Sequence, residues 1–86
     1  MEMSTQEMKM MGISTSPKEL AKQEPFDKAF IDHMIPHHES AIDMARVALE
    51  DSNNTEIKEI AQAIVAAQQR EIEQMKRWRQ EWYPQD

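Results

Sequence analysis

The chain has 86 residues, a net charge of −6 and no cysteine. This length allows one small domain, and the missing cysteine excludes disulfides, thiolate zinc sites and cysteine nucleophiles. The negative charge argues against nucleic acid as a partner, and no run approaches the roughly 18 apolar residues that membrane insertion needs. One glycine and 8 methionines in a chain that is 40% hydrophobic favour an all-α fold.

Residues 1–24 are polar and rich in methionine, without a sustained apolar period, so we expect a flexible arm. Ser16, Pro17 and Glu19 match a capping box with proline in the first turn, which predicts a short helix over 17–23. The thioethers of the arm either form a weak site for a monovalent metal ion or have no such role. They belong to Met1, Met3, Met8, Met10 and Met11.

Residues 25–86 are expected to form an antiparallel helical hairpin domain. Apolar residues recur at spacings of three and four over a first helix at about 26–50 and a second at about 55–82. Because two helices of this size bury little apolar surface, we expect two hairpins to form a homodimer that is a four-helix bundle.

Polar and proline residues mark where these helices begin. Pro25 and Asp27 suit the first turn of the first helix, and Asn54 or Thr55 is the predicted cap of the second. Pro36 removes one backbone donor inside the first helix. The apolar pattern continues on both sides of it, so we favour a kink over the start of a separate helix.

All three histidines of the chain fall within six residues, as His33, His37 and His38. Met34 lies among them, and Met44 follows on the same helix. Imidazole and thioether suit soft or borderline metal ions, above all monovalent copper and silver. His33 and His37 are one turn apart, and so are Met34 and His38 on a face displaced by about 100°. This pattern predicts two neighbouring sites, or one site with supporting residues around it.

Gln68 and Glu71 interrupt the apolar stripe of the second helix, and a buried carboxylate needs a compensating partner. If the helices fold back about Asn53, facing residues have numbers that sum to roughly 105. Gln68 then lies level with His37, and Glu71 lies level with Met34. Helical bundles build metal sites from facing helices in this way. The candidate metal ligands are His33, Met34, His37, His38, Met44, Glu71 and Met75.

Each candidate also has a purely structural interpretation. The histidines can satisfy polar groups of the core, and Met44 and Met75 have the spacing of core residues. Glu71 can accept a hydrogen bond from an imidazole without touching the metal. Trp78 and Trp82 are expected to be packing residues or dimer contacts.

The run FDKAFIDHMIPHHESAIDMA at residues 26–45 resembles the CopM-like family, formerly described as a domain of unknown function (number three hundred and five). A later run, with AQAI at 61–64 and QQREIEQMKRW at 68–78, is similar to the family's second block. The resemblance implies a ferritin-like four-helix bundle that handles copper or silver in some members. It also implies a periplasmic or otherwise exported protein; since no signal peptide is recognisable, we then expect the chain to be a mature form or an excised domain. His33, Met34, His37, His38 and Met44 match the first block, and Met75 matches the second.

The favoured function is the binding of monovalent copper or silver, for sequestration or transfer in metal homeostasis or resistance, without catalysis. Zinc and divalent copper are the less favoured ions. The alternative is a helical interaction or dimerisation module whose histidines are structural. A di-iron oxidase is disfavoured, because its sites use Glu-x-x-His motifs and the sequence contains none.

Overall fold

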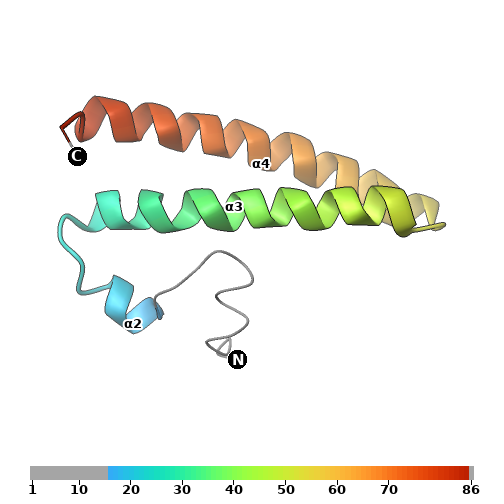
Figure 1. Cartoon of the computed structure of the whole chain (residues 1–86), viewed down its shortest axis with the longest axis horizontal. Helices are drawn as coiled ribbons and strands as arrows, with labels where there is room; N and C mark the ends of the chain where they lie inside the picture. Colours follow the sequence, from blue (N-terminus) through green and yellow to red (C-terminus); the bar gives the residue numbers. More distant parts are fainter. Residues whose placement is uncertain (1–15, 86) are drawn as a thin grey trace.

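The computed structural model describes residues 16–85, which form an all-α hairpin (Figure 1). Its helices are α2 (Pro17–Leu20), α3 (Phe26–Asp51) and α4 (Thr55–Trp82). The two long helices are antiparallel and lie side by side, and α2 lies near the beginning of α3 on the side away from α4. The long helices match their predicted bounds to within one residue. None of the helices in the described range is long and apolar enough to cross a membrane.

α2 is shorter than the helix predicted over 17–23. Ser16 is its N-cap, and the Ser16 hydroxyl accepts a hydrogen bond from the backbone N–H of Glu19 at 3.2 Å. This contact is the one that the capping-box pattern predicts. The helix ends at Leu20 and gives way to a turn. The predicted arm methionines lie outside the described residues.

The two long helices begin in different ways. Pro25 is the N-cap of α3 and makes no side-chain capping bond. At α4, the side-chain oxygen of Asn54 accepts hydrogen bonds from the N–H groups of Glu56 and Ile57, at 2.9 and 3.2 Å. These donors would otherwise lack a partner within the helix. α3 is continuous through Pro36, so the alternative that a separate helix starts there is wrong.

The core between α3 and α4 is thin. Among residues 16–85, its buried apolar side chains are Ile31, Ile42 and Ala45 of α3 and Ala61, Ile72 and Met75 of α4. No large side chain in this range is completely enclosed. The reason is geometric: in a hairpin each helix has a single neighbour, which covers only the arc that faces it.

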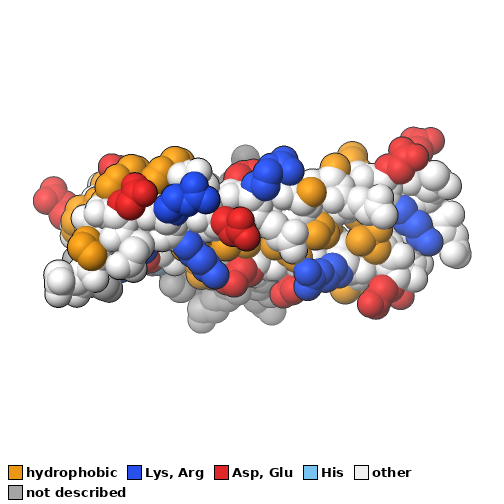
Figure 2. Space-filling model, turned by 90° about the horizontal axis from the view of Figure 1, so that it is seen from above, with side chains coloured by type: hydrophobic (Ala, Val, Ile, Leu, Met, Phe, Trp, Pro, Cys, Tyr) orange, Lys and Arg blue, Asp and Glu red, His pale blue; other side chains and the backbone are white. Residues whose placement is uncertain are grey.

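The exposed apolar surface is therefore larger than the predicted stripes suggest. Phe26, Phe30 and Met44 on α3 are exposed, and so are Trp78 and Trp82 on α4. Figure 2, which looks down onto α4, shows hydrophobic side chains at the surface between charged ones along the hairpin. The apolar face that the sequence gives to each long helix is wider than the face that the other helix can cover.

Arg79 links the end of α4 to the beginning of α3. The Nε of Arg79 on α4 donates to the carboxylate of Asp32 on α3 at 2.8 Å. An Nη of the same guanidinium donates to the carbonyl oxygen of Tyr83 at 2.8 Å, just beyond the end of α4. Exposed ion pairs add little stability, and this one joins the two helices beside the groove described next.

Candidate metal centre

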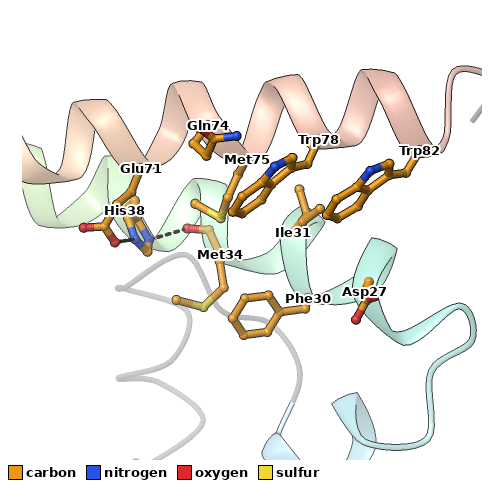
Figure 3. Close-up of a pocket in the computed structure, with 10 residues that line it drawn as sticks. All are labelled: Asp27, Phe30, Ile31, Met34, His38, Glu71, Gln74, Met75, Trp78 and Trp82. Atoms are coloured by element: carbon orange, nitrogen blue, oxygen red, sulfur yellow. Dashed lines mark hydrogen bonds and ion pairs between the residues drawn. The ribbon is translucent and has the colours of Figure 1, made fainter.

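A mostly apolar groove of about 500 Å³ lies between α3 and α4, near the start of α3 and the end of α4 (Figure 3). Its residues divide into two groups. The aromatic end has Phe30, Trp78 and Trp82, and the end with ligand chemistry has Met34, His38, Glu71 and Met75. Both helices contribute to each group, so the groove depends on the hairpin and not on either helix alone.

His38 is the central side chain of the second group. It is 7% exposed, and its position on α3 directs it toward α4. Its Nδ1 lies 2.9 Å from the carbonyl oxygen of Met34, one helical turn earlier, and its Nε2 lies 2.9 Å from Oε1 of Glu71. With both nitrogens protonated, the ring donates to both oxygens. In the neutral ring with its proton on Nδ1, Nε2 presents the lone pair that a metal ion would bind.

Glu71 brings the only charge into this end of the groove. Its side chain is 57% exposed, so one oxygen can contact His38 while the carboxylate stays hydrated. That exposure explains how an acidic residue is accommodated at a position of an apolar stripe. The carboxylate is placed either to bind an ion beside Nε2 or to orient the imidazole.

Thioethers flank His38 on both sides of the groove. Met34 belongs to α3 and Met75 to α4, where Met75 is buried at 6% exposure. Within residues 16–85, no three side chains of His, Asp and Glu are grouped closely enough to hold a metal ion. A metal site in this groove would therefore need sulfur ligands, and that donor set suits soft monovalent ions better than zinc.

His37 lies next to this cluster. Its ring centroid is 6.0 Å from that of His38, at an interplanar angle of 63°. Two imidazoles that share one ion have a similar separation of about 6 Å, when each metal–nitrogen bond is about 2 Å. The Nδ1 of His37 is buried without a hydrogen-bond partner, as is Oε1 of Gln68 on α4. Buried polar atoms are normally paired, so these two are polar groups whose bonding capacity is unused in this structure.

The remaining predicted ligands lie elsewhere. His33 lines a separate hollow with Pro25, Lys28 and Asp32, on the side of α3 where the chain arrives from α2. Met44 is 67% exposed and does not line the groove. The structure thus brings together Met34, His38, Glu71 and Met75, places His37 beside them, and leaves His33 and Met44 apart.

The helix register differs from the predicted one. Glu71 was expected level with Met34, but it contacts His38, and the numbers of this pair sum to 109. Helical side chains tilt toward the N-terminus of their own helix and cover a spot about one residue back. In an antiparallel pair, the tilt of both side chains raises by about two the sum of the residue numbers that meet. A long side chain such as Glu71 reaches further still. The side chains that meet across the hairpin therefore lie later along each chain than the predicted register places them.

The aromatic end of the groove was not predicted as part of the site. The rings of Trp78 and Trp82 are stacked, with centroids 5.4 Å apart and an interplanar angle of 6°. Phe26 and Phe30 stack at 6.1 Å on the facing helix. The spacing of four residues within each pair is the signal that places both rings on one face.

A helical hairpin that holds imidazole, carboxylate and thioether groups in one groove has the construction of a helical metal-binding protein. The chain belongs to the family described as a domain of unknown function, DUF305, whose model matches residues 1–79.

Solved structures and a viral sequence resemble the chain. CopM in the Cu(I)-bound form is 38% identical, with a TM-score of 0.77 over 80% of this chain and 49% of the CopM chain. CopM in the Ag-bound form is 37% identical, with the same TM-score over 83% of this chain and 52% of that one. An uncharacterized protein of Acanthamoeba polyphaga mimivirus is 39% identical over 49 residues, which are 57% of this chain and 32% of the viral protein. The chain thus spans about half of the CopM chains and a third of the viral protein.

Proposed function

We propose that the protein binds monovalent copper or silver ions in the groove between α3 and α4. The observation that carries the proposal is His38, whose Nε2 faces Glu71 in a groove that Met34 and Met75 also line. Solved structures that resemble this chain contain Cu(I) and Ag. His37 adds a second imidazole beside the cluster.

The donor set supports a soft ion. Thioether sulfur and imidazole nitrogen favour Cu(I) and Ag(I), whereas Mg²⁺ and Ca²⁺ need several oxygen ligands. Zinc and divalent copper could still use His37, His38 and Glu71, and they are the weaker candidates because the remaining ligands would be sulfur. The ion is cargo in this proposal, and sequestration or transfer is the function that an open groove allows. The proposal includes an exported location and a pair of hairpins as the functional unit.

A methionine pair in the chain offers a matched test. Met75→Leu keeps the volume of the side chain but removes the buried thioether, and Met44→Leu makes the same change at an exposed position outside the groove. Anaerobic titration with Cu(I), read by native mass spectrometry and a competing chelator, should show at least tenfold weaker binding for Met75→Leu and no change for Met44→Leu. Equal losses would show that the effect is not specific to the groove, and the proposed location of the site would be rejected.

The same contacts also support a structural role for His38, which would make the hairpin an interaction module. His38 is buried, and both of its ring nitrogens have oxygen partners without any metal. The titration separates the two functions. If the wild-type protein binds neither Cu(I) nor Ag(I) at micromolar concentration, the structural interpretation holds and the proposed function fails.

A further inference from the structure

One face of the hairpin is apolar along its whole length and is left open by residues 16–85. On α3 it carries Phe26, Phe30, His37 and Met44, which recur at spacings that keep them on one side of the helix. By the 100° rotation per residue, this stripe lies about 100° around α3 from the buried arc of Ile31 and Ala45. It is a second apolar stripe, distinct from the one that packs on α4.

α4 has a matching stripe. Ile60 and Ile64 are exposed, and Trp78 and Trp82 continue the same side toward the end of the helix. The helical rotation puts this stripe about 75° around α4 from its buried residues. On each helix the exposed stripe is rotated away from the buried arc. Because the helices are antiparallel, these two rotations turn both stripes toward the same face of the hairpin. The groove confirms this at one end, because Phe30 and Met34 line it together with Trp78 and Trp82.

Charged residues are nearly absent from this face. Between Ile57 and Trp82, the α4 stripe includes one charged residue, Glu71, and its carboxylate has a partner in His38. Nine large hydrophobic residues are exposed on the described chain, and most of them lie on these two stripes. An apolar patch of this extent marks an interaction surface.

The size of the face suits a second hairpin. Helices of 26 and 28 residues are about 40 Å long, and two of them side by side are about 20 Å wide. The face is then roughly 800 Å², which is the area that each partner contributes to a stable protein interface. A two-fold pair needs one self-complementary surface, and a mostly apolar stripe on each helix meets that requirement. The matched region covers about half of each CopM chain, so the remainder of those chains is about as long as the matched hairpin.

We propose that a second copy of the chain covers this face, and that the metal groove is enclosed at the interface between the two copies. The metal part of this statement rests on the proposed function. His37 and Met34 lie on the covered face, so an ion bound beside them would be shielded from water by the partner. Metal binding then strengthens the pairing, and pairing strengthens metal binding by the same factor.

The test compares two exposed aliphatic residues. Ile60→Glu places a charge on the open face near the hairpin turn, where the wild-type side chain is 61% exposed. Ala66→Glu is the matched control: Ala66 is exposed but lies on the outer side of α4, about 140° around the helix from both the open face and the buried residues. Sedimentation velocity of the full chain at micromolar concentration should give about twice the chain mass of 10.1 kDa for wild type and Ala66→Glu, and the single mass for Ile60→Glu.

The same samples are measured with Ag(I), and their tryptophan emission is recorded. Ag(I) should lower the dimer dissociation constant of wild type at least fivefold, and Ile60→Glu should shift the emission of Trp78 and Trp82 to longer wavelength. Circular dichroism checks that the variants keep their helix, with Ile64→Glu as the replacement if Ile60→Glu unfolds. A dimer without any Ag(I) binding would leave the interface standing and reject the proposed function.

The interface is rejected by any of three results. The first is a wild-type monomer at all concentrations, with or without Ag(I); if its tryptophan emission is also that of buried indoles, the first fifteen residues cover the face instead. The second is a dimer that Ile60→Glu does not disrupt. The third is equal disruption by Ala66→Glu, which would place the contact on another surface.

Discussion

At the scale of single residues, the contacts of His38 determine what the groove can do. The carbonyl oxygen of Met34 holds Nδ1, and the acidic oxygen of Glu71 faces Nε2. A proton on Nε2 and a metal ion at Nε2 therefore occupy the same place and exclude each other. The carboxylate attracts either of them, since both are positive. A buried imidazole held in this way can bind a metal ion at Nε2 only when that nitrogen carries no proton.

This competition predicts a pH dependence for metal binding. Imidazole binds a metal ion only without its proton, so the affinity for Ag(I) should be lower in acid than at neutral pH. Thioether sulfur does not take up a proton in this range. Titrations with Ag(I) at several pH values between about 5 and 8 measure the effect. An affinity that does not change with pH would show that the ion is held by methionine alone.

At the scale of the helices, the sequence predicted most of what forms, because the signals are local. Ser16 and Asn54 accept hydrogen bonds from the first N–H groups of their helices, and such a bond depends on a few neighbouring residues. The continuity of α3 through Pro36 was also readable, since the apolar period is unbroken on both sides. The exposure of Phe30 and Trp82 was not readable. Periodicity shows which residues share a face, but how many neighbouring helices cover that face is a property of the assembly.

The cap of α4 can be tested at this scale. Asn54→Ala removes the oxygen that accepts hydrogen bonds from the N–H groups of Glu56 and Ile57, so the free energy of unfolding should fall by about 1 kcal/mol. Asn53→Ala changes the same residue type one position earlier, where the side chain is exposed and caps nothing, and it should have an effect within about 0.5 kcal/mol. Urea unfolding of both variants, followed by circular dichroism, gives the comparison. Equal destabilisation would mean that the turn, and not the cap, limits stability.

At the scale of the whole molecule, the sequence predicted which residues form the candidate site better than it predicted which of them contact each other. Met34, His38, Glu71 and Met75 were all chosen from the sequence and line one groove. The pairing of Glu71 with His38 was not predicted, because the turn position sets the level of the backbones while side-chain tilt sets the level of the tips. His33 was grouped with His37 by its spacing of one turn, and yet it lines a hollow beside the segment that enters α3. Helical spacing does not show how the chain before a helix folds back on it.

If the proposed function holds, a bound ion should raise the stability of the whole hairpin, whose own core is thin. An ion that binds only the folded state adds stability in proportion to the logarithm of its concentration, about 2.7 kcal/mol when it is present at a hundred times its dissociation constant. For a domain of this size each kcal/mol raises Tm by about 4–8 °C, so saturating Ag(I) or Cu(I) should raise Tm by roughly 10 °C or more. Mg²⁺ and Ca²⁺ at the same concentration should leave Tm unchanged, since oxygen ligands are too few in the groove. Scanning calorimetry of the full chain with each ion, followed by a strong chelator of Cu(I) or Ag(I), measures the effect and its reversal. An equal rise with Mg²⁺ would point to general screening of the −6 net charge, and the groove would then have no part in the stabilisation.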